Sequence, residues 1–384
     1  MTNRRWARLL VLVALLVAVL GTAIYVRNRK SGGGAASPRL LAAKFHERAL
    51  QPDANAEDLL SLALRAADEL VKDYPDDPGA WSVQARRHYL LSETEQARRL
   101  WRRSLDLDPN FAEAYFGLGL VALDADQHVQ AIERFEDVAR LAPDDPRVPV
   151  LLAKGLLLAG RTEDAILVLE QHIASQQTSA EAWEMLGQAH LQAQRFDRAA
   201  EAFEVALGAV PQMKDALYGV SRAYAGLGQT QKAAEYTEAF RRLADAAQAE
   251  NTAGAKAFRD RDFAAHVAAQ THADAARIYL RHGKVQESED LLLRAVHLEP
   301  VNVEYFVQLQ HGLQQRGAHV HAAEVGERIV ELDPNRLDQW LNLGWLYAHV
   351  NQPEKAIAAC RRAIELDPKD PRCRQAYEII RQFP

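Results

Sequence analysis

The stretch WEMLGQAH, residues 183–190, has close counterparts at two other places in the chain. Residues 115–122 read YFGLGLVA, and residues 340–347 read WLNLGWLY. In all three, an aromatic residue is followed three residues later by Leu and four residues later by Gly. This spacing places the three residues on one side of a helix. The recurrence of one phrase within a single chain indicates an internal repeat.

Prolines give the length of that repeat, because they recur at intervals of 34 residues. A first series holds Pro75, Pro109, Pro143, then Gln177 in place of a proline, then Pro211, and a second series holds Pro300, Pro334 and Pro368. A fixed period of this length is typical of stacked helical hairpins. Ala, Leu, Glu, Arg and Gln dominate the composition, which also favours helix, and no segment predicts a strand.

Two positions of the repeat carry small residues when the proline is numbered position 32. Position 8 is Ala85, Gly119, Ala153, Gly187, Ser221, Ala276 and Gly344, and position 20 is Ala or Ser in each unit from Ala97 to Ala356. Positions 4, 7, 11 and 24 are mostly large. Small residues let the two helices of a hairpin approach closely, and the large ones fill the space between them.

This pattern resembles the tetratricopeptide repeat family, with large residues at 4, 11 and 24, Gly or Ala at 8, Ala at 20 and Pro at 32. The resemblance covers about nine tenths of the chain. It implies an all-α fold, a right-handed α-solenoid of helix-turn-helix repeats.

The repeats predict two blocks. The first block, 44–247, starts with a degenerate unit in which Pro52 interrupts the first helix, followed by five regular units. A helical insertion, 248–268, forms a joint that we expect to bend or to hold a dimer contact. The second block, 269–370, has three units, and 371–384 forms a capping helix. In the unit before the insertion Asp245 replaces the proline, so we expect its second helix to continue.

Two units depart from the pattern. Unit 146–179 has Pro149 at position 4 and Gln177 at position 32, and unit 303–336 has Gln310 at position 8 and Gly326 at position 24. We expect these four residues to loosen the local packing without changing the fold.

The N-terminus predicts a membrane anchor. A short basic tail, 1–8, precedes residues 9–26, which contain no charged residue and as a helix would measure roughly 27 Å, close to the thickness of the hydrocarbon core. A flexible basic and Gly-rich linker, 27–43, follows. The alternative is a cleaved signal peptide with small residues at 21–23 as its cleavage site.

The orientation of this anchor follows less directly from the sequence. Basic residues flank both sides of the span, and counting them alone favours a cytoplasmic body. Long C-terminal domains translocate largely regardless of charge, whereas a tail with three arginines resists translocation. We therefore expect a single-pass protein of the bacterial inner membrane with its repeat body outside the cytoplasm, and keep the cytoplasmic body as the alternative.

Net charge argues against nucleic acid as a partner. The chain has a net charge of −6, and because residues 1–30 contribute six positive charges, the remainder carries −12. Such a body repels phosphate backbones. No phosphate-binding loop, nucleophile elbow or zinc-protease motif occurs, and the string GLGLVA at 117–122 lies within a predicted helix rather than after a strand. The sequence therefore predicts neither an enzyme nor a cofactor.

Two residue groups have both a functional and a structural interpretation. His311, His319, His321 and Glu324 surround one predicted turn, where a zinc site is less expected than solvated histidines because no Cys is near. Cys360 and Cys373 are interpreted as a small core residue and a cap residue, with a disulfide that staples the cap as the alternative.

A ligand of such a solenoid is expected on the first helix of each unit. In the family that the chain resembles, positions 2, 5, 9 and 12 of this helix line a concave groove. The binding residues predicted here are Arg86, Phe116, Leu120, Lys154, Gln188, Tyr218 and Arg222 in the first block and Arg277, Arg281, His311 and Trp345 in the second. Spaced cations and apolar residues suit a protein or peptide partner that carries acidic and apolar side chains.

The sequence thus predicts a membrane-tethered scaffold that binds proteins during assembly, secretion or maturation of an envelope complex. A regulatory subunit of a membrane enzyme complex and a self-assembling structural protein, in which the chain forms homo-oligomers, are the two alternatives.

Overall fold

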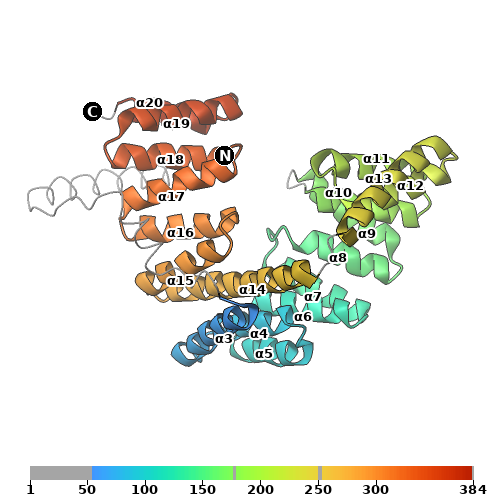
Figure 1. Cartoon of the computed structure of the whole chain (residues 1–384), viewed down its shortest axis with the longest axis horizontal. Coiled ribbons are helices and arrows are strands. Elements are labelled where there is room, and N and C mark those ends of the chain that lie inside the picture. Colours follow the sequence, from blue (N-terminus) through green and yellow to red (C-terminus); the bar gives the residue numbers. More distant parts are fainter. Residues whose placement is uncertain (1–53, 176–178, 250–252, 383–384) are drawn as a thin grey trace, which may run out of the picture. The chain divides into compact units, whose positions relative to one another are not determined.

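The first block is built from helical hairpins in the computed structural model, which describes residues 54–175, 179–249 and 253–382. The helices of this part, shown in Figure 1, are α3 (Ala56–Asp73), α4 (Pro78–Leu90), α5 (Thr94–Leu107), α6 (Ala112–Asp124), α7 (His128–Leu141), α8 (Val148–Leu158), α9 (Thr162–Ala174), α10 (Ala180–Gln192), α11 (Phe196–Ala209), α12 (Lys214–Gly226) and α13 (Thr230–Ala249). The last helix, α13, continues past Asp245, which stands where other units have proline.

The second block begins with the longest helix of the described chain. Its helices are α14 (Ala253–Arg281), α15 (Val285–Leu298), α16 (Val303–Gln315), α17 (His319–Leu332), α18 (Leu337–His349), α19 (Pro353–Leu366) and α20 (Pro371–Ile380). The described residues contain helices and no strands, which confirms the predicted all-α class for this part of the chain. None of their helices is both long and apolar enough to cross a membrane, and the predicted anchor at 9–26 lies outside these ranges.

The turn between the two helices of each hairpin has one backbone conformation. Position 15 of every regular unit has a positive φ, from 56° at Asp126 to 77° at Gly160. These residues are Ser92, Asp126, Gly160, Gln194, Gly228, Gly283, Gly317 and Asn351. Glycine reaches this left-handed region without a steric cost, and the other side chains reach it at a small one. The hairpin geometry is therefore uniform although the turn sequences differ.

Hydrogen bonds join the aromatic residue at position 4 of one repeat to the proline at position 32 of the repeat before it. The indole Nε1 of Trp81 donates to the carbonyl oxygen of Pro75 at 2.7 Å, and that of Trp340 donates to Pro334 at 2.8 Å. The Tyr115 hydroxyl donates in the same way to Pro109 at 3.0 Å. The aromatic residue at position 4 thus satisfies a carbonyl that the end of the preceding helix leaves free.

Small residues at position 8 lie directly against position 24 of the same hairpin. A Cβ atom added to Gly119 would lie 2.7 Å from the Phe135 ring, and one added to Gly187 would lie 2.7 Å from Phe203. In the last unit, a Cβ on Gly344 would lie 2.8 Å from the Cys360 Sγ. These distances are too short for real contacts, so the side chains opposite require glycine at these three positions.

In unit 303–336 the large residue is at position 8 and the small residue is at position 24, the reverse of the usual order. A Cβ on Gly326 would lie 2.5 Å from Nε2 of Gln310, so the Gln310 side chain fills the space that a large residue at position 24 occupies elsewhere. Gln310 is 1% exposed, and its Nε2 donates to the carbonyl of Ala322 at 3.1 Å. Its Oε1 accepts from Nδ2 of Asn342 at 2.8 Å. The expectation that this pair loosens the packing was wrong, because the two departures compensate.

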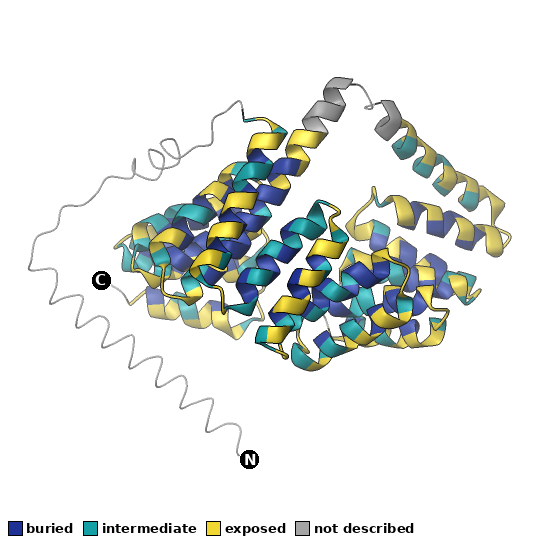
Figure 2. Cartoon of the chain, turned by 90° about the horizontal axis from the view of Figure 1, so that it is seen from below, coloured by how far each residue is buried: buried dark blue, intermediate teal, exposed yellow. Residues whose placement is uncertain are grey.

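The core consists of apolar side chains between stacked helices rather than of one central cluster. Figure 2 shows buried residues along the inner sides of most helices, with exposed residues on the opposite sides. The largest fully buried side chains include Trp101, Phe135, Phe203, Leu169, Leu309 and Leu343. Burial of each such side chain contributes roughly 1.5–3 kcal/mol, so the stability is distributed along the array.

The insertion packs on the helix α3 of the same chain. Leu59 of α3 contacts Ala264 and Ala265 of α14, and Ala63 contacts Val267 and Ala268. Further along, Ile278 of α14 packs among apolar residues of α3 and α4. Figure 1 shows α14 beside these two helices. Within the described residues, the segment predicted as a joint is therefore a buried contact between the start of the first block and the second block.

Polar contacts support this packing. The Tyr279 hydroxyl donates to Asp73 at 2.7 Å, and Arg281 donates to Asp77 at 2.7 Å. These partners are about 200 residues apart in the sequence.

The exchanged pair predicts strong coupling between Gln310 and Gly326. Gly326→Leu alone should destabilise the protein by roughly 1–3 kcal/mol, since the new side chain meets Gln310. Gln310→Ala alone should also destabilise it, because it leaves a cavity and removes the partner of Asn342. The double variant restores the usual pattern and should cost clearly less than the sum of the two, measured by thermal unfolding. Additive effects would contradict the compensation.

Candidate functional site

The predicted first-block residues lie on α4, α6, α8, α10 and α12, but they differ in accessibility. Lys154, Gln188, Tyr218 and Arg222 are exposed, and Arg86 and Leu120 are half-buried. Of the exposed group, Tyr218 presents 51% of its surface to solvent. The exposed residues come from α8, α10 and α12, which are the first helices of three successive repeats. This is the arrangement expected of a surface that stacked first helices form.

Phe116 does not offer its ring to a partner. It is 7% exposed, its ring centroid is 6.0 Å from that of Phe135, and the Arg147 guanidinium lies 4.0 Å above it. Arg147 belongs to the next repeat and also pairs with Glu113 at 3.0 Å, which fixes it over the ring. The sequence placed Phe116 at a groove position, but the neighbouring arginine covers it.

Three predicted residues line one hollow between α10 and α12. Gln188, Tyr218 and Arg222 surround a volume of about 380 Å³, together with Asp215 and the edge of Phe203. The Arg222 guanidinium lies 5.9 Å from the centre of the Tyr218 ring, within the range of a cation–π contact. An aromatic ring, a cation and an amide thus converge on one concave surface.

A buried carboxylate on the same face was missed by the sequence reasoning. Glu184 is 8% exposed and accepts a hydrogen bond from Nε2 of Gln188. Burial raises the pKa of Glu184 to about 7; the bond from Gln188 and the charge of Lys154 lower it, and the nearby Asp215 raises it further. Glu184 and Asp215 occupy positions 5 and 2 of their units, so the repeat register identifies both as groove positions.

The predicted residues Arg277 and Arg281 meet Arg86 instead of forming a separate second-block groove. All three line one pocket, where Asp274 of α14 pairs with Arg86 at 3.4 Å and also with Arg277. Burial lowers the pKa of Arg86, and the charge of Asp274 opposes this shift. Sequence reasoning placed these arginines in two blocks and gave no signal that α14 lies on α4.

The other two second-block residues lie on α16 and α18. His311 is exposed, and its Nε2 lies 2.8 Å from the side-chain nitrogen of Gln315. Trp345 is 43% exposed, and its ring lies 3.7 Å from that of His349 and 5.4 Å from that of His319. Trp345 is thus available as an aromatic contact, although histidines flank it.

No group of three or more His, Cys, Asp or Glu side chains in the described ranges is arranged to hold a metal ion. Cys360 and Cys373 are free and buried, and the Cys373 thiol lies 3.6 Å from the Ala363 carbonyl oxygen. Burial raises the pKa of Cys360 to about 11, with a further contribution from Cys373. Both thiols pack as small core residues where the cap meets the last repeat.

Comparison with known families gives the class of this array. A tetratricopeptide repeat model matches residues 82–146, 150–214 and 185–259, and a second tetratricopeptide repeat model matches 338–370. The chain belongs to the tetratricopeptide repeat family. The predicted resemblance is therefore confirmed.

Individual relatives of this tetratricopeptide repeat protein are distant. Human protein O-mannosyl-transferase TMTC3 is 25% identical over 197 residues, which are 50% of this chain and 20% of that protein. The match thus spans about a fifth of the length of this relative.

Solved structures with a similar arrangement include MamA from Desulfovibrio magneticus, with 19% identity, coverage of 44% of this chain and 96% of that chain, and a TM-score of 0.41. PilW, described as a type IV pilus biogenesis factor, has 17% identity, coverage of 62% and 98%, and a TM-score of 0.42. Pseudomonas aeruginosa PilF has 18% identity, coverage of 63% and 96%, and a TM-score of 0.39.

Glu184 predicts a pH-dependent stability of this tetratricopeptide repeat array. Its folded-state pKa of about 7 exceeds the usual value of about 4.3, so its contribution is fully present below pH 4.3 and is lost as the pH rises through 7. Glu184→Gln keeps the acceptor for Gln188 but never ionises. Its melting temperature should therefore exceed that of the wild type by a few degrees at pH 8 and match it near pH 4.

The matched control is Glu136→Gln, on the exposed side of α7. This variant should show no such pH dependence. A Glu184→Gln difference that is the same at pH 4 and pH 8 contradicts the burial argument.

Proposed function

We propose that this protein is a membrane-tethered, non-enzymatic scaffold whose first-helix surface binds protein partners that carry acidic and apolar side chains. Tetratricopeptide repeat proteins bind protein partners, which supports the general role. The observation that carries the specific proposal is the hollow between α10 and α12, where the predicted residues Gln188, Tyr218 and Arg222 converge.

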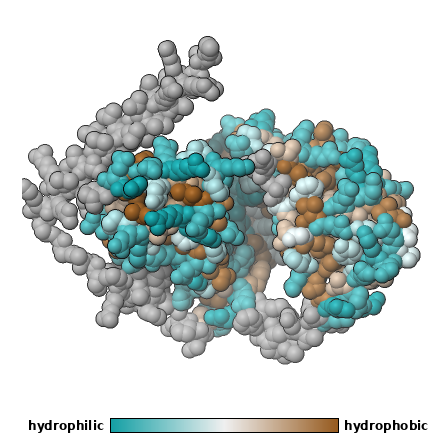
Figure 3. Space-filling view, turned by 90° about the horizontal axis from the view of Figure 1, so that it is seen from above, coloured by the Kyte–Doolittle hydropathy of each residue, from teal (hydrophilic) through white to brown (hydrophobic). Residues whose placement is uncertain are grey.

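The chemistry of this hollow supports a peptide ligand. Tyr218 is half-exposed, and an aromatic side chain can cover apolar groups of a partner while its hydroxyl stays in water. Lys154 on α8 and Arg222 on α12 are exposed cations on the first helices that flank α10, so they attract acidic side chains. Figure 3 shows hydrophobic residues in patches among hydrophilic ones on one face of the molecule.

The membrane tether rests on the sequence of residues 9–26 and on the basic residues that flank them. We place the repeat body outside the cytoplasm of a bacterium, where a tethered scaffold recruits proteins during assembly, secretion or maturation of an envelope complex. The acidic repeat body disfavours nucleic acid as a partner in either compartment.

Charge reversal of the two exposed cations tests the binding surface. Lys154→Glu combined with Arg222→Glu should remove at least one protein partner from crosslinked membrane pull-downs, because each reversal replaces attraction by repulsion. The matched control, Arg99→Glu with Arg361→Glu, reverses two exposed arginines on the second helices α5 and α19 and should retain that partner. Both variants must keep the wild-type circular dichroism.

An unchanged set of partners in the first variant contradicts the proposed surface. Capture of a catalytic subunit alone would indicate the regulatory-subunit alternative, and recovery of only further copies of the same chain would indicate self-assembly.

The tether and its orientation require a separate experiment. Protease added to intact spheroplasts should digest the repeat body, while a cytoplasmic marker protein survives until lysis. Deletion of residues 9–26 should move the protein from the membrane fraction to the soluble fraction. A body that is protected until lysis contradicts the orientation, and a soluble wild type with a shortened N-terminus supports the cleaved signal peptide instead.

A further inference from the structure

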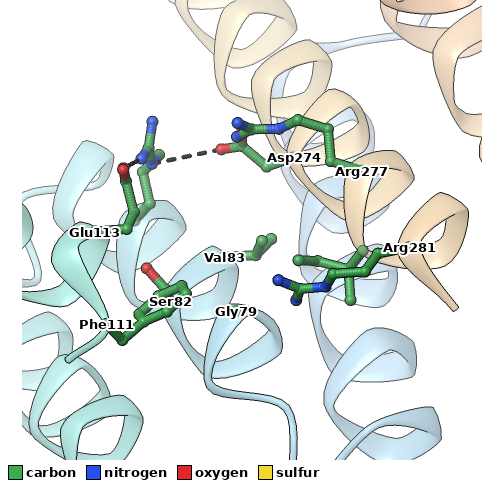
Figure 4. A pocket seen from close by; sticks show the side chains of 10 residues that line it. Gly79, Ser82, Val83, Phe111, Glu113, Asp274, Arg277 and Arg281 are labelled. Carbon is green, nitrogen blue, oxygen red and sulfur yellow. Dashed lines mark hydrogen bonds and ion pairs between the residues drawn. The ribbon is translucent and has the colours of Figure 1, made fainter. Parts of the chain in front are cut away.

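A pocket of about 350 Å³ lies where α14 crosses α4 and the start of α6 (Figure 4). It exists only because the insertion brings α14 onto the first helix of unit 78–111. The pocket therefore combines side chains that are about 200 residues apart in the sequence. Its volume is within the range of roughly 300–1,000 Å³ that is usual for ligand sites.

The floor of this junction pocket is apolar. Val83 of α4 and Ile278 of α14 are 6% and 8% exposed, and Phe111, which precedes α6, lines the same pocket. Gly79 allows the two helices to meet, since a Cβ there would lie 2.6 Å from Cδ1 of Ile278. The floor can thus receive one apolar side chain without exposing polar backbone.

The rim carries two arginines one helical turn apart on α14. The side chains of Arg277 and Arg281 are 57% and 52% exposed, and Figure 4 shows both guanidinium groups extending from α14 toward α4. Nη2 of Arg281 donates to both carboxylate oxygens of Asp77 at 2.7 Å, and Nη2 of Arg277 donates to Asp274. Each guanidinium has five N–H donors, so these bonds hold one edge of the group and leave other donors for a ligand.

The arginines of the pocket are paired with carboxylates, and these charges balance locally in a body of negative net charge. Arg86 pairs with Glu113 and Asp274, Arg277 pairs with Asp274, and Arg281 pairs with Asp77. Carboxylates that already fix the guanidinium groups also reduce the entropy lost when a further anion binds.

We propose that the junction pocket binds an acidic residue and its apolar neighbour in a protein partner, with the carboxylate between Arg277 and Arg281 and the apolar side chain on Val83 and Ile278. This inference rests on the proposed protein-binding function and adds a second contact site to it. A planar guanidinium matches a carboxylate in a bidentate geometry, and the apolar floor selects a peptide over a free inorganic anion.

Peptide binding to the full-length protein in detergent micelles tests this site. The probe is a fluorescein-labelled hexapeptide, Glu-Leu-Glu-Leu-Glu-Phe, measured by fluorescence anisotropy. Arg277→Gln with Arg281→Gln should weaken binding by roughly tenfold or more, as expected when charge-assisted hydrogen bonds are lost. If the double variant unfolds at a lower temperature, Arg277→Gln alone serves, because Asp274 then keeps Arg86 as its partner.

The matched control is Arg241→Gln with Arg242→Gln. These are also exposed neighbouring arginines on one helix, α13, and both pair with one carboxylate, Glu238. The control should bind the peptide as the wild type does. A photoreactive benzoylphenylalanine in place of Phe111 should crosslink to the peptide, and the same group in place of Phe196 should not.

Four results would overturn the inference: no binding by the wild type, equal binding by the Arg277 and Arg281 variant, no crosslink at Phe111, or displacement of the peptide by equimolar inorganic phosphate. Lys154→Glu with Arg222→Glu separates this inference from the proposed function. If this variant loses its partner in pull-downs while the Arg277 and Arg281 variant binds the peptide as the wild type does, the scaffold function stands and the junction pocket fails. If the Arg277 and Arg281 variant loses the peptide while Lys154→Glu with Arg222→Glu keeps every partner in pull-downs, the pocket stands and the α10–α12 surface fails.

Discussion

The close contact between positions 8 and 24 of a hairpin is the constraint on which the rest of this array depends. Glycine opposite Phe135, Phe203 or Cys360 sets how closely two helices pack, and a Cβ atom at any of these glycines would collide with its partner. Where this contact is kept, neighbouring hairpins can stack in the same way. The first-helix surface follows from that stacking, whereas the junction pocket depends on the packing of α14 against α4.

Much of this organisation could be predicted from the sequence, because the constraint acts on residues 16 positions apart in a regular register. Gln310 and Gly326 show where such reasoning fails. Considered one at a time, each departs from the pattern, yet their volumes exchange and the Gln310 amide finds partners in Ala322 and Asn342. Packing responds to the sum of the volumes in a contact, and a position-by-position comparison does not detect a compensated pair.

The position of α14 could not be predicted for a different reason. Periodicity reports contacts between neighbouring repeats, whereas α14 contacts α3 and α4, about 200 residues away. The sequence predicted a helical joint at 248–268 but did not indicate which part of the chain it contacts. Arg86 lies on α4, and Arg277 and Arg281 lie on α14, as the repeat register predicts. Their convergence in one pocket depends on the contact between α14 and α4, which no local sequence pattern encodes.

The arrangement of charges on the first-helix surface was also not predicted from local sequence patterns. Net charge and isolated cations suggested a groove for acidic groups, but Glu184 and Asp215 lie among Lys154 and Arg222 on the same face. A buried carboxylate is costly unless something stabilises it, and here one amide donor and one nearby cation do so only in part, so its pKa stays near 7. A surface of this kind discriminates by the order of charges along a partner rather than by their sum. The proposed binding surface therefore favours a partner whose acidic and apolar side chains follow the order of the charges on α8, α10 and α12.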